Sequence, residues 1–200
     1  MELSACLSSE RVMQQGDFTG TAAVALQAAR GEYESAQVVV TAAGGKVENV
    51  TAAVAPSADA ERVLPAEWVT LYRVAYVPVR YSAPRAVCPP GLVPDPLIPF
   101  QDPYTGAPVR EPKWNDAKPT GQRFGAQGFD VWQGHHQPIW LDVRVPADAA
   151  PGAYETILRV TAANAAAADI PVCLEVWDFA LPEGPTQESS FGGFSYAAEQ

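Results

Sequence analysis

Alternation of apolar and polar positions predicts β-strands in four stretches of the chain. They are Tyr33–Thr41 and residues 137–145, 153–161 and 169–179. Residues two apart share one side of a strand, and in each stretch one such side is apolar enough to face a core. In the last stretch the expected core-facing side chains are Ile170, Val172, Leu174 and Val176.

Weaker apolar patterns predict three further strands, at residues 22–28, Val47–Ala55 and residues 68–79. Pro78 is expected to end the last of these or to place it at a sheet edge, because proline cannot donate to a strand ladder. Pro151 and Gly152 fit the two central positions of a type II turn. Gly44-Gly45 predicts a hairpin, and residues 164–168 predict another connection.

Short strands separated by turns, without a repeated helix, predict an all-β fold. We expect an antiparallel two-sheet β-sandwich of jelly-roll or immunoglobulin-like type, spanning residues 1–182. A long Pro/Gly-rich loop insertion is expected at residues 78–138, which hold twelve of the 19 prolines. Six aromatic residues are expected to anchor this loop: Phe100, Tyr104, Trp114, Phe124, Phe129 and Trp132.

Composition narrows the class of partner. The net charge of -10, with only 13 Lys and Arg, argues against nucleic-acid binding. No apolar run is long enough for a membrane-spanning helix, so no membrane partner is expected. The N-terminus lacks a signal-peptide pattern. The chain as it stands is therefore expected in the cytoplasm, whereas a truncated N-terminus would allow a secreted or periplasmic protein.

Several patterns of catalytic and metal-binding chemistry were sought, and none predicts a site. Cys6, Cys88 and Cys173 form no CxxC pair and are interpreted as free, mostly buried thiols. The neighbours His135 and His136 would point to opposite sides of a strand, so no metal site and no cofactor are expected. Two acidic pairs were considered for glycoside hydrolysis and interpreted as solvent-facing or turn-capping residues: Glu32 with Glu34, and Asp95 with Asp102.

Four blocks of sequence together resemble the N-terminal β-sandwich of glycoside hydrolase family 123-like proteins, many of unknown function. The blocks read ARGEYESAQVVV at 29–40, PDPLIP at 94–99, QPIWLDV with VP and PGAY between 137 and 154, and VWDF with LP at 176–182. The resemblance implies that a catalytic (β/α)8 barrel of the same polypeptide follows as a partner. In that family an adjacent Asp-Glu pair in the barrel supports hydrolysis of N-acetylgalactosaminides, with help from the substrate's acetamido group.

Such a barrel needs about 250 residues, and only 18 follow Pro182. No catalytic residue is therefore assigned in this chain. Residues 183–200 are expected to be a linker or the start of the missing barrel. The residues expected at a domain interface are Asp95, Phe191, Phe194 and Tyr196.

Three loop aromatics carry the prediction of a binding site. Tyr104, Trp114 and Trp132 have flat apolar rings on which sugars can stack, or they anchor the long loop. Two functions follow. The first is a non-catalytic accessory domain that packs on the barrel. The alternative is a stand-alone carbohydrate-binding or surface-adhesion β-sandwich module, with glycans as partners.

Overall fold

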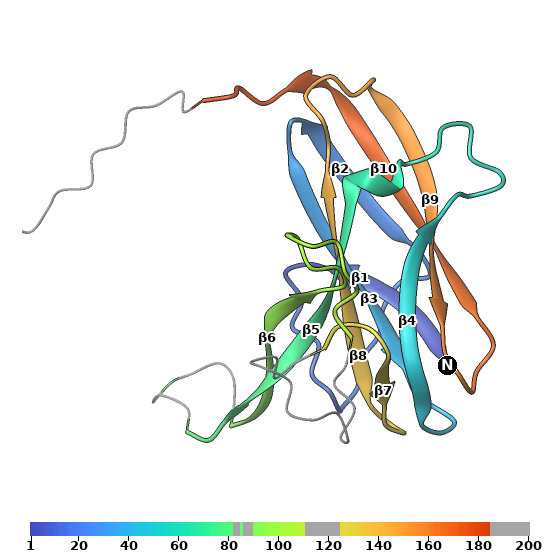
Figure 1. Cartoon of the computed structure of the whole chain (residues 1–200). Helices are drawn as coiled ribbons and strands as arrows, with labels where there is room; N and C mark the ends of the chain where they lie inside the picture. The colour runs from blue at the N-terminus through green and yellow to red at the C-terminus, as the bar shows by residue number, and fades with distance from the viewer. Residues whose placement is uncertain (82–84, 86–89, 111–124, 185–200) are drawn as a thin grey trace, which may run out of the picture.

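The computed structural model describes residues 1–81, 85, 90–110 and 125–184, and within them ten strands form two five-stranded sheets (Figure 1). The strand order is β1-β3-β8-β5-β6 in the first sheet and β2-β10-β9-β4-β7 in the second. The strands are β1 (Glu2–Leu7), β2 (Val24–Arg30), β3 (Tyr33–Thr41), β4 (Val47–Ala55), β5 (Val69–Val79), β6 (Gly91–Pro99), β7 (Phe129–Val131), β8 (His136–Arg144), β9 (Gly152–Thr161) and β10 (Ala168–Ala180), with a short 3-10 helix, η1 (Ala66–Trp68), before β5. The predicted all-β sandwich is confirmed.

Every pair of strands in the described chain is antiparallel except one. β10 pairs with β9 in antiparallel register from Ala168↔Val160 to Val176↔Gly152. Its other neighbour, β2, runs parallel to it. The prediction of an antiparallel sandwich therefore holds for all strand pairs of the described chain but β10–β2.

The core lies between the sheets and contains the side chains that the alternation predicted. Leu174 on β10, Leu158 on β9 and Leu141 on β8 are fully buried, while their strand neighbours Cys173 and Arg159 face solvent. Burying each such leucine contributes about 1.5–3 kcal/mol relative to leaving it exposed. These contacts hold the two sheets together.

β3 departs from simple alternation because both of its sides are buried. Gln37 and Val39 point away from the core, yet both are buried, and the N-terminal segment that follows β1 binds Gln37. The Gln37 side-chain amide donates to the carbonyl oxygens of Leu7 at 3.1 Å and Glu10 at 2.8 Å. The Tyr76 hydroxyl donates to the carbonyl oxygen of Val12 at 2.9 Å. Part of the outer face of the first sheet is therefore buried.

The connections confirm two predictions and correct one. Residues 162–167 join β9 to β10 as a hairpin, and Gly152 has the positive φ of +116° that the Pro151-Gly152 turn requires. Gly44-Gly45 was predicted as a hairpin, which is wrong. β3 and β4 belong to different sheets, so this link crosses from one sheet to the other.

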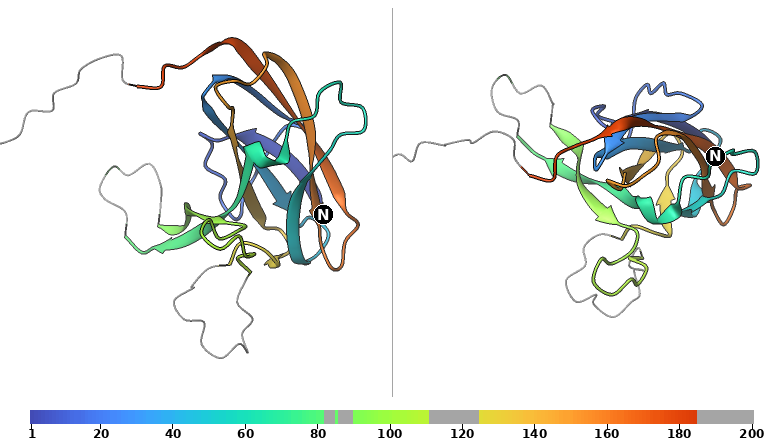
Figure 2. Two further views of the ribbon diagram at one scale, coloured as in Figure 1. Left: turned by 45° about the horizontal axis from the view of Figure 1, so that its top comes forward. Right: turned by 90° about the horizontal axis from the view of Figure 1, so that it is seen from above.

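The Pro/Gly-rich stretch 78–138 is not one loop, because it contains β6 and β7 and the start of β8. β6 pairs with β5 from Tyr72↔Pro99 to Val79↔Gly91. β5 pairs with β8 only as far as Arg73. Beyond that residue β5 and β6 form a two-stranded arm, which contains Pro78 (Figure 2). The prolines of β6 lack an N–H and suit an edge strand. Of the six predicted aromatic anchors, Phe100 and Phe129 are buried, whereas Tyr104 and Trp132 are exposed. Trp114 and Phe124 lie outside the described residues.

The thiols are more exposed than predicted. Cys6 on β1 is half-buried and Cys173 on β10 is exposed, because both side chains point away from the core. Cys88 lies outside the described residues. Both described cysteines are free thiols, as predicted. Among the described residues, no helix has the length and apolar content needed to cross a bilayer.

Candidate functional site

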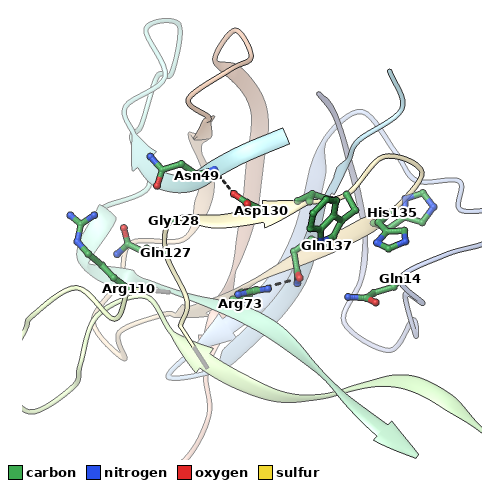
Figure 3. Close-up of a pocket in the computed structure, with 12 residues that line it drawn as sticks. Gln14, Asn49, Arg73, Arg110, Gln127, Gly128, Asp130, His135 and Gln137 are labelled. Atoms are coloured by element: carbon green, nitrogen blue, oxygen red, sulfur yellow. Dashed lines mark hydrogen bonds between the residues drawn. The ribbon is translucent and has the colours of Figure 1, made fainter. Parts of the chain in front are cut away.

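A polar pocket of about 650 Å³ opens at the end of the sandwich where β7 begins (Figure 3). Both sheets contribute to it, since β5 and β8 come from the first and β4 and β7 from the second. Its described lining consists of Gln14, Asn49, Arg73, Arg110, Gln127, Gly128, Asp130, Val131, Trp132, His135, His136 and Gln137. We call it the β7 pocket.

A bulge in β4 shapes one wall of the β7 pocket. The register between β4 and β7 shifts between Val47 and Val50, and Asn49 takes a left-handed φ of +52°. The Asn49 amide then donates to Asp130 Oδ1 at 2.9 Å, and the Gly128 amide donates to the Val50 carbonyl oxygen at 2.8 Å. The bulge therefore fixes the position of the only carboxylate among the described lining residues.

Asp130 is held as a carboxylate. Burial alone would raise its pKa, but the hydrogen bonds from Lys46 and from the Asn49 amide hold the pKa of Asp130 below its usual range. Lys46 Nζ lies 2.7 Å from Asp130 Oδ2 and 4.7 Å from the centroid of the Trp132 ring. Lys46 thus links the acidic group to the exposed aromatic ring.

The floor of the β7 pocket consists of polar residues in core-facing positions. Arg73 pairs with Ile139 across β5 and β8, so it points to the inner side of the sheet, as Gln137 does two residues before Ile139. Arg73 Nε donates to Gln137 Oε1 at 3.3 Å and its Nη1 to the Gly125 carbonyl oxygen at 3.1 Å. Its guanidinium lies 4.7 Å from the centroid of the Phe129 ring. These contacts hold the Arg73 side chain in place at the floor of the pocket.

The two histidines at the pocket have separate partners. The His135 ring is hydrogen-bonded to the Gln15 side chain. His136 Nε2 lies 3.0 Å from the Gly16 carbonyl oxygen, which can only accept, so this nitrogen donates. His136 Nδ1 lies 2.9 Å from Thr41 Oγ1. Both rings therefore fasten the N-terminal segment, and the part of the chain that the structure describes contains no cluster of three or more potential metal ligands.

Of the three predicted sugar-stacking residues, the structure brings one to the pocket. Trp132 is 60% exposed and lines it. Tyr104 is 95% exposed on a separate loop after β6, where Asp102 Oδ1 accepts hydrogen bonds from the Tyr104 and Thr105 amides at 2.9 Å. Trp114 lies outside the described residues.

The predicted interface residues do not form a described cluster. Asp95 was expected to cap a turn, but it lies exposed within β6, where the register with β5 shifts. Phe191, Phe194 and Tyr196 lie outside the described residues. Asp102, the other member of the acidic pair that includes Asp95, caps a turn by accepting hydrogen bonds from the Tyr104 and Thr105 amides.

The acidic pair Glu32 and Glu34 belongs to the turn between β2 and β3 and to the start of β3. Glu32 Oε2 accepts a hydrogen bond from the Ala29 amide at 2.7 Å, and Glu34 Oε2 accepts one from the Ser35 amide at 3.2 Å. Both carboxylates therefore bind local backbone. The pair was predicted to face solvent, whereas both residues are half-buried in the structure.

Sequence reasoning missed Arg73, Asp130 and Gln137 as pocket residues. A signal was present for two of them. Arg73 and Gln137 occupy positions that continue the apolar side of their strands, and a polar side chain there indicates a polar interior at that end. Asp130 carried no such signal, because its position depends on a bulge in another strand.

Comparison with known proteins identifies one family and a number of similar solved structures, two of which are described here. The family model of the glycoside hydrolase 123 N-terminal domain matches residues 13–162. A family 123 glycoside hydrolase from Clostridium perfringens, whose structure addresses glycolipid glycan hydrolysis, is similar with a TM-score of 0.59 and 16% identity over 90% of this chain. A putative membrane anchored protein from Corynebacterium diphtheriae gives a TM-score of 0.37 and 12% identity, covering 94% of this chain and 38% of that one.

This chain spans 28% of the length of the Clostridium hydrolase. The comparison with curated protein sequences gives no match. The likeness to the hydrolase supports the sandwich fold, and the family description covers three quarters of the chain. The chain belongs to the glycoside hydrolase 123 N-terminal domain family.

Proposed function

We propose that this chain is a non-catalytic accessory domain that packs against the catalytic domain of a larger glycoside hydrolase. Family membership supports this, as does the similarity to only 28% of a family 123 hydrolase, most of which lies outside the similar region. The catalytic domain is expected to be a (β/α)8 barrel that follows the sandwich. The proposal covers both the absence of catalysis here and the packing.

One observation carries the packing part of the proposal. β9 pairs with β10 only as far as Val176, and beyond that point three large apolar side chains are exposed. They are Trp177 at 40%, Phe179 at 50% and Leu181 at 42% exposure. The rings of Trp177 and Phe179 stack with centroids 5.7 Å apart. We call these three residues the β10 patch, and it lies where β10 ends at the top of Figure 1.

The β10 patch has the chemistry of a surface that another domain covers. Contiguous exposed apolar residues are uncommon on soluble proteins unless they mark an interaction site. Covering one Trp, Phe or Leu side chain contributes about 1.5–3 kcal/mol, although ordering the two domains offsets part of that. The patch also lies where β10 ends, near residue 182, after which the barrel is expected. A domain joined there would reach the patch without a long linker.

The non-catalytic part rests on the chemistry of glycoside hydrolysis. Most such enzymes place two carboxyl groups about 5–10 Å apart on either side of the scissile bond. The described lining of the β7 pocket has one, Asp130, and it is ion-paired with Lys46. The catalytic carboxyl groups are therefore expected in the barrel.

Hydrolysis is tested directly on the 200-residue chain. We expect no release of p-nitrophenol from p-nitrophenyl N-acetylgalactosaminide, galactoside or glucoside above that of a heat-denatured sample. Release that rises in proportion to the concentration of folded chain would contradict the non-catalytic assignment.

Packing is tested by comparing Phe179→Ser in two contexts, the 200-residue chain and the polypeptide that also carries the catalytic domain. We expect the substitution to lower unfolding free energy by about 1–2 kcal/mol more in the longer protein, because only there is the side chain covered. Tyr104→Ser, on an exposed loop, is the control and should cost the same in both. Equal costs for Phe179→Ser, or a stop codon directly after residue 200, would contradict the packing proposal.

A further inference from the structure

We propose that the β7 pocket is a saccharide-binding site, in which a neutral pyranose stacks on Trp132 and is hydrogen-bonded by the side chains around it. This site is separate from the β10 patch and does not depend on the accessory role proposed above. It gives the domain a binding function of its own.

The first observation is the aromatic ring at the pocket. Trp132 lines a mainly polar pocket but remains 60% exposed, so most of the indole is open to a ligand. Lys46 lies over the ring and is itself bound to Asp130 at 2.7 Å and Glu48 at 3.2 Å. The C–H face of a pyranose is apolar and flat enough to pack on such a ring. Trp132 therefore offers a platform fixed by its neighbours.

The second observation is that the polar side chains divide into two groups. Arg73, Gln127 and Gln137 form the ordered floor, with hydrogen bonds to protein atoms. Gln14, Asn49 and Arg110 line the same pocket, and within the described chain their side chains have no hydrogen-bond partner. Figure 3 shows Asn49 and Arg110 on one side and Gln14 on the other, with Asp130 and Gln137 between them. These three side chains are available to bind the vicinal hydroxyls of a sugar.

The described polar lining suits a neutral ligand because it holds charges of both signs and more side-chain amides than charged groups. Asp130 is held ionised at the pocket, and its pKa lies below the usual range despite its partial burial. The charge of Asp130 is balanced by the ion pair with Lys46, and Arg73 and Arg110 add positive charge to the lining. Side-chain amides are the commonest polar group in the lining: Gln14, Asn49, Gln127 and Gln137. Amides both donate and accept, which matches hydroxyl groups.

Size and backbone geometry agree with a ligand site. A pocket of about 650 Å³ lies within the roughly 300–1,000 Å³ typical of small-ligand sites. Its wall contains the non-glycine residue Asn49 at φ +52°, and such conformations cluster at functional sites. The bulge at Asn49 brings an uncommitted side-chain amide and the anchored Asp130 to the same wall.

The β7 pocket and the β10 patch lie at opposite ends of the sandwich. The strand β9 lies between β10 and β4 and runs antiparallel to both. The unpaired end of β10, which carries the patch, lies beyond Gly152, the first residue of β9. The part of β4 that pairs with β7 lies beyond Thr161, the last residue of β9. Ten residues of β9 lie between these ends, a length of about 30 Å. Figure 2 shows the same separation, with the end of β10 at the top of the left view and β7 at the bottom. A sugar in the pocket is thus compatible with a domain on the patch.

The experiment is a titration of the 200-residue chain with methyl glycosides of N-acetylgalactosamine, galactose, N-acetylglucosamine and glucose, followed by tryptophan fluorescence and by calorimetry. We expect saturable binding of at least one sugar with a Kd on the order of 1 mM. Trp132→Ala should weaken it by about tenfold or more. Trp177→Ala, which removes the same residue type from the opposite end, should change it less than about twofold.

A second variant keeps the test decisive if Trp132→Ala fails to fold, as judged by circular dichroism. Gln14→Ala removes an uncommitted amide from a loop and should weaken binding by about two- to tenfold. No saturable binding of any of the four sugars at 50 mM would overturn the proposal. So would equal effects of Trp132→Ala and Trp177→Ala, or binding of inorganic sulfate in place of every sugar. None of these three results bears on the Phe179→Ser comparison, so the two proposals fail separately.

Discussion

At the scale of single residues, the backbone at Asn49 and Gly128 explains how two sheets produce a pocket. Asn49 at φ +52° and Gly128 at φ +74° are both left-handed, and they face each other across β4 and β7. A Cβ atom on Gly128 would lie 2.9 Å from Asn49 Oδ1. Asparagine and glycine are the residues that tolerate such backbone best. The wall of the pocket therefore depends on these two identities.

Gly128→Ala is expected to lower the free energy of unfolding by about 1–2 kcal/mol, because alanine is strained at positive φ. Gly45→Ala is the matched control, since a Cβ there meets nothing within 4 Å, and it should change stability by less than about 0.5 kcal/mol. Urea unfolding of both variants measures the difference. If Gly128→Ala were as stable as Gly45→Ala, the backbone at Gly128 would accept a side chain without strain, which would contradict this prediction.

Cys6 offers a second test at the same scale. Burial, and after it the charge of Glu10, raise the pKa of the Cys6 thiol to about 11. The thiolate is the reactive form, so at pH 8 a higher pKa leaves a smaller fraction of the Cys6 thiol reactive. The rate of Cys6 alkylation in the native protein should therefore keep rising up to about pH 11. The greater nucleophilicity of a high-pKa thiolate offsets part of this loss, leaving alkylation about tenfold slower than in the unfolded chain.

The measurement uses iodoacetamide on a chain in which Cys6 is the only cysteine, after Cys88→Ser and Cys173→Ser. Native and urea-unfolded samples are compared at pH 8. Glu10→Gln should speed the native reaction slightly, because it removes the nearby negative charge. Identical native and unfolded rates would contradict the assigned environment of Cys6.

At the scale of elements, β10 joins the fold to its proposed interface. Its first nine residues pair with β9 and point alternate side chains into the core, and its last four extend past β9. The same alternation that buries Ile170 and Val172 places Trp177 and Phe179 on the exposed side. One strand thus stabilises the sandwich along most of its length and exposes apolar groups at its end.

The two sides of β10 should differ sharply in their tolerance of substitution. Leu174→Ala leaves a cavity in the core and should cost about 2–5 kcal/mol. Cys173→Ala, one residue earlier on the exposed side, should cost less than about 1 kcal/mol. Chemical denaturation of the two variants gives both values. Similar costs would mean that the register of β10 is wrong.

At the scale of the whole molecule, the sandwich is a rigid spacer with a different chemistry at each end. One end gathers polar groups from four strands around Trp132, and the other exposes the β10 patch. The core between them consists mainly of buried aliphatic side chains from both sheets, with Phe100, Phe129 and Tyr154 among them. A packed core of this kind holds the two ends at a fixed separation.

Substitutions at the two ends should therefore be additive. The stability changes of Trp132→Ala and Trp177→Ala should sum, within about 0.5 kcal/mol, to that of the double variant, because distant sites without shared partners do not couple. Thermal and urea unfolding of the single and double variants measure this. A coupling above about 1 kcal/mol would show that the ends communicate through the core.

The sequence by itself determined which residues form most strands and which side of each faces the core. β3 and β4 match their predicted bounds, and β8, β9 and β10 match theirs within one residue. This information is local, because alternation with a period of two needs only neighbouring residues. The strands β1, β6 and β7 were missed, since they are short, irregular or rich in proline.

Only the tertiary structure decided which strands pair and where the polar groups meet. The link at Gly44-Gly45 crosses between the sheets, although its glycines suit a hairpin equally well. Gln37, on the outer side of β3, is bound by a segment that has no alternation of its own. Arg73, Asp130 and Trp132 come together from β5, β7 and the loop after it. Strand pairing is a choice among partners distant in sequence, and no local pattern encodes that choice.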